Sequence, residues 1–334
     1  MMTDQQAAAL LQEQDLILIL THIRPDGDTI GCAAGLCALL RQMGKTAYVL
    51  PNPGATRHLA PYLAPYLSPS SLAPSFVVSV DMASLSLMPE NAVLYQDKVD
   101  LAIDHHPSYE GFARNACVDT ACAACAELVY RIALACGETV SAEMALPLYM
   151  AIATDTGCFQ YSNTTSETHR IAGALMDTGI DHQRVNRLHF RTKSPRRMCL
   201  EARLISSMLL FDEGTIAVSC VTQAVLDEIG ATEDDAEDLA DIPGRIEGVE
   251  IAVTVREQDG GGAKVSLRTS PSYLNASQVC ALFGGGGHAA AAGCALPHSV
   301  EQTKDLMLGA IRTILQSAEQ DTAGRGLCQT GSLS

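Results

Sequence analysis

Short apolar runs alternate with longer helix-like segments through the first half of the chain. The runs at 15–20, 46–50, 75–81 and 99–106 have the length and composition of buried strands, whereas 31–44, 126–137 and the stretch from 141 onward resemble helices. Ser166 and Glu167 are placed to begin a further helix after a polar loop. Buried strands that alternate with helices predict an α/β fold, in which a parallel sheet carries helices on both faces.

The sequence changes in character from Gly214 onward. Strand-like runs occur at 215–221, 249–257 and 263–269, with an acidic, helix-like stretch at 233–241 and a glycine-rich loop at 283–293. We expect a parallel-sheet domain over 1–188, a connector with a long helix over 189–213, and a smaller α/β domain over 214–317. The polar tail 318–334 has the composition of a disordered segment.

The composition is that of a soluble globular protein. Of the 334 residues, 47% are hydrophobic and 18% are charged, and no apolar stretch approaches the ~18 residues of a membrane helix. The first residues lack the basic start and cleavage site of a signal peptide, so we expect a cytoplasmic protein with no membrane partner and reduced cysteines. Cys122 and Cys125 form a CxxC that we interpret as packing, because a structural zinc site needs four ligands.

The net charge of −16 argues against binding to long nucleic acid, which requires many Lys and Arg side chains to neutralise phosphates. A small phosphorylated ligand is compatible with this charge, because it needs only a few basic groups in one pocket. A dense basic cluster in the connector consists of Arg187, Arg191, Lys193, Arg196 and Arg197. We interpret it as a solvated face, with guidance of a short phosphate chain as the alternative.

Acidic residues and histidines gather where the predicted strands end. The loop "THIRPDGDTIG" follows the first strand, "VVSVD" and "LAIDHH" end two others, and "AIATDTG" ends a helix. In an open parallel sheet the carboxyl ends of the strands meet at one edge, where ligands bind. The residues expected to meet there are His22, Asp26, Asp28, Asp81, Asp104, His105, His106 and Asp155.

Oxygen and imidazole ligands without thiolates suit Mn²⁺ or Mg²⁺, and the number of carboxylates exceeds what one ion needs. Two ions about 3.5–4 Å apart could share a bridging carboxylate and stabilise the attacking and leaving oxygens of a phosphoryl displacement. The alternative for each residue taken singly is a helix-capping Asp or a hydrogen-bonded surface His. Carboxylates crowded together without a cation would repel one another, which favours the metal site.

The motifs "HIRPDGDTIG", "VSVDMAS", "DHH", "TDTGCFQYSNTT" and "FGGGGHAAAAG" resemble, in order, those of the DHH phosphoesterase superfamily with its DHH-associated C-terminal domain. The resemblance extends over nearly the whole chain up to the tail. It is strongest to the NrnA-type branch of bifunctional oligoribonucleases (nanoRNases), which also remove the 3′-phosphate from 3′-phosphoadenosine 5′-phosphate (pAp). "IEGVEIAVTVRE" followed by "KVSLRTS" is similar to a stretch of that branch.

The resemblance implies two Mn²⁺ ions, with Mg²⁺ or Co²⁺ as alternatives. It assigns His22, Asp26 and Asp81 to one ion and Asp28, Asp81, His105 and Asp155 to the other, with Asp81 bridging. Asp104 would orient the histidines. His106 would contact the scissile phosphate or assist the leaving oxygen.

In the second domain, the glycine run from Gly284 to Gly287 would let backbone amides approach a phosphate, with a flexible surface loop as the alternative. We expect Gly285, Gly286, Gly287, His288 and Arg268 to bind substrate, the last two through charge-assisted contacts.

The expected function is a metal-dependent phosphoesterase that hydrolyses short RNA oligonucleotides to 5′-mononucleotides and removes the 3′-phosphate of pAp. Alternatives within the enzyme class are linear dinucleotides derived from cyclic dinucleotide signals, and pyrophosphate. A nucleotide-sensing binding protein with a degenerate centre is the alternative outside it. The sequence leaves the oligomeric state open, a homodimer included.

Four positions depart from the pattern of the branch. Arg24 stands where a small polar residue is common, Cys32 and Cys158 stand where Ser is common, and Gln160 replaces an expected Arg. The last change removes a cation near the metal edge. It leaves the metal ligands untouched and bears on the balance between oligonucleotide and mononucleotide substrates.

Overall fold

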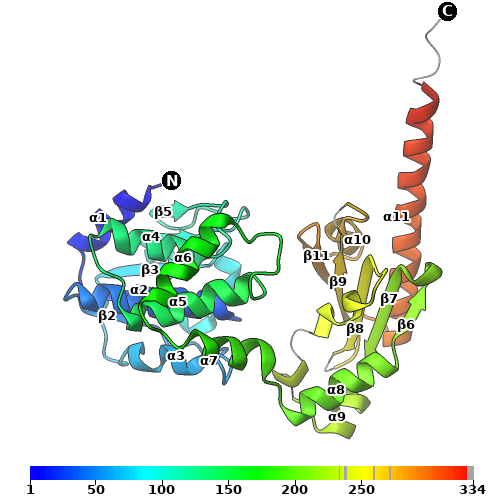
Figure 1. Cartoon of the computed structure of the whole chain (residues 1–334), viewed down its shortest axis with the longest axis horizontal. Coiled ribbons are helices and arrows are strands. Elements are labelled where there is room, and N and C mark those ends of the chain that lie inside the picture. The colour runs from blue at the N-terminus through cyan, green and yellow to red at the C-terminus, as the bar shows by residue number, and fades with distance from the viewer. Residues whose placement is uncertain (233, 237–238, 259, 271, 329–334) are drawn as a thin grey trace, which may run out of the picture. The chain divides into compact units, whose positions relative to one another are not determined.

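The computed structural model describes residues 1–232, 234–236, 239–258, 260–270 and 272–328, with side chains up to residue 317 (Figure 1). The chain divides into two units, Met1–Thr192 and Lys193–Ser334. The division falls inside the predicted connector 189–213.

Five parallel strands form the sheet of the first unit, in the order β2-β1-β3-β4-β5. Their bounds are β1 Ile17–Leu20, β2 Ala47–Val49, β3 Phe76–Val80, β4 Leu101–Asp104 and β5 Asn115–Val118. The first four coincide with the predicted runs. Strand β5 was not predicted, because its four residues are mostly half-buried and lack a long apolar run.

Helices and turns fill the connections of this unit. The α-helices are α1 Asp4–Glu13, α2 Gly27–Gln42, α3 Ala60–Leu63, α4 Cys125–Ala135, α5 Ala142–Asp155, α6 Ser166–Asp177 and α7 His182–Asn186. The 3₁₀ segments are η1 Ala64–Tyr66, η2 Leu85–Leu87 and η3 Glu90–Lys98, and a π-helical turn, η4, covers Arg187–Arg191.

The two faces of this sheet are covered by different kinds of helix: α-helices cover one face, and the 3₁₀ helix η3 covers much of the other. Ile17 and Ile19 point into the larger core, which the described α-helices of the unit build. Leu18 and Leu20 point to the other face, where they pack with Met88 and with residues of the 3₁₀ segment η3. A strand sends successive side chains to opposite faces, so both faces are buried, one of them under short turns.

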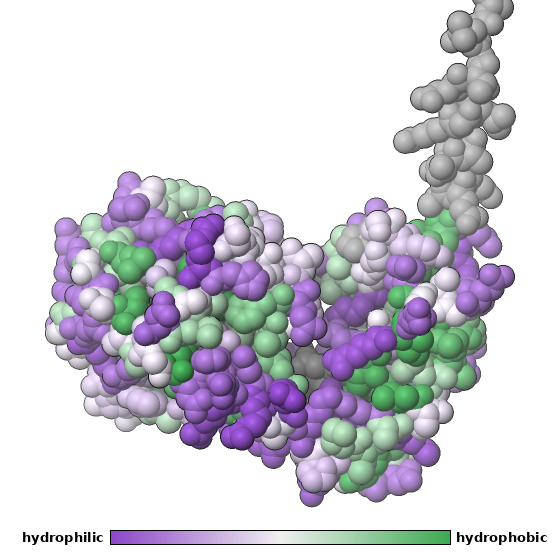
Figure 2. Space-filling model, in the orientation of Figure 1, coloured by the Kyte–Doolittle hydropathy of each residue, from purple (hydrophilic) through white to green (hydrophobic). Residues whose placement is uncertain are grey.

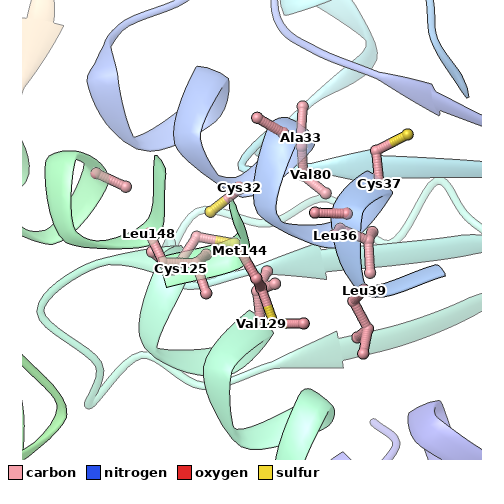
Figure 3. Close-up of a cluster of buried hydrophobic side chains, with 14 of the residues drawn as sticks. Cys32, Ala33, Leu36, Cys37, Leu39, Val80, Cys125, Val129, Met144 and Leu148 are labelled. Atoms are coloured by element: carbon pink, nitrogen blue, oxygen red, sulfur yellow. The ribbon is translucent and has the colours of Figure 1, made fainter. Parts of the chain in front are cut away.

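Helix α2 runs through the middle of the larger core and packs closely against α5. Figure 3 shows side chains of α2 gathered with Val129 of α4 and Met144 of α5. The close approach depends on glycines one turn apart: a Cβ on Gly31 would overlap the carbonyl of Pro147, and one on Gly35 would lie 2.6 Å from Leu148 Cδ2. The first turn of α2 thereby comes to lie beside the last turn of α5.

The second unit has a mixed sheet in the order β10-β11-β9-β8-β7-β6, in which β7 and β8 are parallel and the other pairs are antiparallel. The strands are β6 Leu209–Phe211, β7 Ile216–Val221, β8 Ile251–Glu257, β9 Ala263–Thr269, β10 Gly286–Gly287 and β11 Ala291–Leu296. The helices are α8 Pro195–Ser206, α9 Gln223–Ile229, α10 Ala276–Ala281 and α11 Val300–Cys328, with 3₁₀ turns η5 Asp212–Gly214, η6 Asp234–Ala236, η7 Leu239–Asp241 and η8 Pro243–Arg245.

Two predictions for this unit need correction. The acidic stretch 233–241 forms the 3₁₀ turns η6 and η7 over its described residues, and 233, 237 and 238 lie outside them. Helix α11 extends to Cys328, into the segment 318–334 for which the sequence predicts disorder, and 329–334 lie outside the described residues. Within the described part of the chain, no helix combines the length and the apolar character needed to cross a bilayer.

Candidate metal centre

The strand order gathers the predicted residues at one edge of the first sheet. The chain leaves β1 for β2 on one side and returns to β3 on the other, so the carboxyl ends of β1 and β3 flank the point where the order reverses, which is where ligands bind in such sheets. His22 follows β1, Asp81 follows β3, and Asp104 ends β4. Asp28 reaches the same edge from the first turn of α2, and Asp155 reaches it from the last turn of α5.

Asp81 lies at the centre of this cluster. The residue is 2% exposed and adopts a left-handed backbone with φ of 53°. Its Oδ2 accepts a 2.6 Å hydrogen bond from the Thr29 hydroxyl, whereas its buried Oδ1 has no hydrogen-bond partner. Burial, followed by the charges of Asp28 and Asp26, raises the pKa of Asp81 well above its ordinary value. A buried carboxylate oxygen without a hydrogen-bond partner is energetically unfavourable, and a bound cation would stabilise it.

Three overlapping groups of side chains offer metal ligands within 4.8 Å of one another. One consists of His22, Asp26 and Asp81, and a second consists of Asp28, His105 and Asp155. The first group is the set that the resemblance implies for one ion. The second contains three of the four residues implied for the other ion, without Asp81. The third group joins Asp81 to His105 and His106.

His105 is oriented with one ring nitrogen toward the carboxylates. Its Nδ1 lies 3.2 Å from the carbonyl oxygen of Cys122, which can only accept a hydrogen bond. Nδ1 therefore acts as the donor of this hydrogen bond, which leaves Nε2 as the nitrogen that can bind a metal ion. That Nε2 lies 3.7 Å from Asp28 Oδ2, 3.5 Å from Asp81 Oδ1 and 3.8 Å from Asp155 Oδ2.

Asp26 and Asp28 also cap helices. Helix capping, the alternative to metal binding for a single Asp, is therefore observed for both residues. Asp26 Oδ1 accepts from the Thr29 amide at the start of α2. Asp28 accepts from the amides of Cys125 and Ala126 at 2.6 and 3.1 Å, where Ala124 provides no side-chain cap for α4. Helix capping and metal ligation are compatible, because capping fixes the carboxylates in place.

The Asp104 side chain stabilises the "DHH" turn through hydrogen bonds to the two residues that follow it. Its Oδ1 accepts from the amides of His105 and His106 and lies 2.7 Å from His106 Nδ1, and the residue is fully buried. The Nε2 atom of His106 is left as the ring nitrogen that a substrate could meet. The side chain is 32% exposed, which is more than His22 or His105.

Asp155 completes the second group from the last turn of α5. Burial and the charges of Asp28 and Asp26 raise its pKa to about 8. Burial likewise raises the pKa of Asp28, against the opposing charge of His105. The cluster as a whole therefore stays partly protonated unless positive charge is supplied, and its oxygen and imidazole donors fit a hard divalent cation.

The predicted substrate residues of the second unit lie around Ala291. In the sheet register Arg268 of β9 faces Ala291, whose carbonyl accepts from the His288 amide. Gly286 and Gly287 form β10 and pair with β11. Arg268 is 40% exposed and its Nε donates to Asp241 at 3.0 Å.

The expectation that Gly285 offers its amide to a phosphate is not supported by the geometry. The Gly285 amide donates to the carbonyl of Cys280, and that of Gly284 donates to Ala281. A Cβ at Gly285 would overlap the carbonyl of Gly293, so glycine is needed here for close packing of the chain on β11. Gly286 has open space around it and is exposed.

Two contributors to the first site were missed in the sequence. Thr29 binds Asp81, and the backbone carbonyl of Cys122 orients His105. Thr29 had a local signal, because it lies within the quoted loop. The Cys122 carbonyl had none, since a backbone acceptor 17 positions away is visible only in the fold. The Cys122 and Cys125 thiols take part in none of the three ligand groups found among the described residues.

Two family models match the chain. The DHH family N-terminal domain matches residues 16–152, and the DHHA1 domain matches residues 213–317. The first match spans the loops from His22 to His106, and the second spans the sheet of the second unit from β7 to β11.

Relatives match over nearly the whole length. The bifunctional oligoribonuclease and PAP phosphatase NrnA of Thermus thermophilus is 32% identical over 306 residues, which are 90% of this chain and 91% of that protein. The protein of the same name from Bacillus subtilis is 25% identical, over 91% of this chain and 96% of its own. The crystal structure of an exopolyphosphatase-related protein from Bacteroides fragilis, 24% identical, has the same fold, with a TM-score of 0.82 over 95% of this chain and 97% of that one. The chain therefore belongs to the DHH family, as a two-domain member of the NrnA type.

Proposed function

We propose that this protein is a cytoplasmic phosphoesterase that hydrolyses short RNA oligonucleotides to 5′-mononucleotides and removes the 3′-phosphate of pAp. Two divalent cations, Mn²⁺ in first place, would bind at the edge of the first sheet. His22, Asp26 and Asp81 would hold one ion, and Asp28, Asp81, His105 and Asp155 the other.

The observation that carries the metal proposal is the buried Asp81 Oδ1. This atom has no hydrogen-bond partner and lies 3.5 Å from both His105 Nε2 and His106 Nδ1. A carboxylate that is shared by two ligand groups and short of a partner fits a bridging ligand. The substrate proposal rests on the relatives named as oligoribonucleases and PAP phosphatases, which match 90% and 91% of this chain.

The cations would supply Lewis acidity toward the phosphoryl oxygens and would lower the pKa of the attacking water. The chain's own groups position the reaction. Asp104 fixes the His106 ring through Nδ1, which leaves Nε2 as the ring nitrogen that would meet a phosphate or a leaving oxygen. The Cys122 carbonyl keeps the Nε2 lone pair of His105 on the side of the carboxylates.

We assign nucleotide binding in the second unit to Arg268, Gly286, Gly287 and His288. The guanidinium and imidazole would contact phosphate, and Gly286 would leave space for it beside β11, because no atom lies within 4 Å of the position that its Cβ would take. Gly287 instead packs closely on Ala291 and Ala292. Gly285 stays in this group only as the residue that shapes the turn. Its amide is already used within the fold.

The test is a Mn²⁺-dependent time course on 5′-labelled RNA of two, three, five and twenty-four nucleotides, with pAp in parallel. We expect rapid hydrolysis of the shortest oligomers, little hydrolysis of the longest, and release of phosphate from pAp. The Asp81→Asn variant should have no activity on any of these substrates. Asn is the matched replacement, because it tolerates the left-handed backbone of this position better than Ala. Activity in purified Asp81→Asn protein would refute the metal site. Metal binding without turnover of any substrate would redirect the search to linear dinucleotides and pyrophosphate.

A further inference from the structure

A strongly positive segment stands out in this acidic protein. From His182 to Leu200 the chain has six Lys and Arg residues and no Asp or Glu, although the net charge of the whole chain is −16. The first part of this segment forms α7 and η4 of the first unit. There Arg184, Arg187 and Arg191 are exposed.

This segment contacts Tyr62 of α3, and a second basic stretch precedes that helix. The hydroxyl oxygen of Tyr62 lies 3.2 Å from His189 Nε2, and their rings are 5.9 Å apart. Arg57 and His58 come just before, with Arg57 Nε donating to His58 Nε2 at 3.2 Å. Burial raises the pKa of Tyr62, and the nearby charge of Arg184 opposes that shift. Burial and then His58 lower the pKa of His189. We name these five residues the Tyr62 surface. Figure 2 shows hydrophilic side chains gathered over this part of the first unit.

The centre of the Tyr62 surface is a fixed pair of neutral rings. Tyr62 is half-buried against the larger core, and so is Phe190, the neighbour of His189. Burial, and then the charge of His58, lowers the pKa of His189 to about 4, so the imidazole is uncharged near neutral pH. Two immobilised rings flanked by arginines have the make-up of a single-stranded nucleic acid site, in which bases stack on rings and cations face the phosphates.

The Tyr62 surface is joined to the metal centre through one loop. Asn52 Nδ2 donates to the His22 carbonyl at 2.7 Å and to the Thr21 hydroxyl at 2.8 Å. The next turn of the same loop, at Gly54, packs so closely against the Ile23 carbonyl that a Cβ would lie 2.5 Å from it. Arg57 follows three residues later. The loop that begins beside the His22–Asp26 segment therefore ends at the Tyr62 surface.

We infer that the Tyr62 surface binds the nucleotides of a short RNA that extend beyond the scissile phosphodiester, by stacking on Tyr62 and His189 and by phosphate contacts to Arg57 and Arg184. This inference rests on the proposed oligoribonuclease function and adds where the remainder of the chain binds. A mononucleotide such as pAp has no further nucleotide to place there. The surface therefore favours oligonucleotides over pAp.

The experiment compares Arg57→Gln/Arg184→Gln and Tyr62→Leu with the parent chain. KM is measured on a pentanucleotide RNA and on pAp over a range of salt concentrations. We expect the double variant to raise the KM for RNA about tenfold and to lower the slope of log KM against log salt by about 1.4, at ~0.7 per single-strand phosphate contact. Tyr62→Leu should raise it about fivefold or more through lost stacking. The constants for pAp should stay unchanged.

The control is Arg114→Gln, which makes the same Arg→Gln change once, at an exposed arginine of the same unit. Arg114 pairs with Asp100 next to β5, at the edge of the sheet opposite the metal centre. It should leave both substrates unaffected. A double variant with the KM and salt slope of the control would overturn the inference and leave the basic segment as a solvated helix face. Equal losses on RNA and pAp would overturn it too, because the residues would then act on the reaction centre or the fold.

A binding measurement separates this inference from the proposed function. In the Asp81→Asn background, fluorescence anisotropy of a labelled pentanucleotide reports affinity without turnover. If the parent fails to hydrolyse RNA, the proposed function falls, yet a tenfold affinity loss on adding the two arginine changes would still support the surface as an RNA site. Unchanged affinity would refute it.

Discussion

The carboxylate of Asp28, in the first turn of α2, accepts a 2.6 Å hydrogen bond from the backbone amide of Cys125, which lies 97 residues away at the start of α4. A second amide, that of Ala126, donates to the other oxygen of the same carboxylate. Because Ala124 cannot cap α4, Asp28 does so. One side chain thus ties two helices together at the edge where the metal ligands meet.

Replacing Asp28 should therefore damage the fold as well as the site. Asp28→Ala leaves two buried amides without an acceptor, and we expect the free energy of unfolding of the metal-free protein to fall by about 1–3 kcal/mol. The matched variant is Asp155→Ala, which removes a carboxylate from the same ligand group but caps no helix N-terminus. Urea denaturation in the presence of chelator measures both. Equal stability of the two variants would contradict the capping role.

The metal-free protein should lose stability as the pH rises. In the folded state the pKa of Asp155 is about 8, and that of Asp81 is raised as well, against an unfolded value of 3.8. The folded state then binds more protons than the unfolded state between these values. The stabilisation is complete below the unfolded pKa and is lost as the pH rises through about 8. We expect Tm in chelator to fall between pH 6 and pH 9.

Two controls identify the source of that pH dependence. Asp155→Asn should flatten the profile, because one of the groups no longer titrates. Saturating Mn²⁺ should remove much of the fall in the parent, because a bound cation replaces the proton. A mutant profile as steep as that of the parent would show that other groups cause the dependence.

The glycine contacts between α2 and α5 should be needed for both stability and metal binding. Gly31→Ala brings a methyl group into the carbonyl of Pro147, and overpacking of this kind costs about 1–3 kcal/mol. The affinity for Mn²⁺ should fall too, since Asp28 and Asp155 are placed by this contact. Gly173→Ala in α6 is the control. No atom lies within 4 Å of its Cβ, so it should stabilise by about 0.4–1 kcal/mol and leave metal binding unchanged.

His106 should affect turnover and leave metal binding intact. We expect His106→Ala to lower kcat about 10²–10⁴-fold, the range for a group that transfers a proton or orients a leaving oxygen. Asp104→Asn should give a smaller loss, because the ring stays in place but the carboxylate no longer stabilises its protonated form. Equilibrium dialysis should find the same number of bound ions in all three proteins. A lower metal content in His106→Ala would make it a ligand instead.

Much of this protein is determined locally by its sequence. The apolar runs 15–20, 46–50, 75–81 and 99–106 correspond to four strands, because a buried parallel strand needs only a short continuous apolar run. The acidic residues and histidines at the strand ends were equally visible, since a side chain's place at the end of a run is a property of a few consecutive residues. The order of the motifs was enough to indicate the DHH family.

Only the tertiary structure decided which of these groups meet and what else they do. The strand order brings Asp81 beside His22 and His105, and the fold around it imposes a left-handed backbone that no local pattern encodes. The cap on α4 comes from a residue 97 positions away, and Tyr62 contacts His189, which lies 127 positions later in the chain. The packing around Gly285 assigned its amide to the fold, against the prediction from the glycine run. Each of these contacts joins segments that are distant along the chain, so its energy depends on the packing of the whole unit and leaves no periodic trace in the sequence.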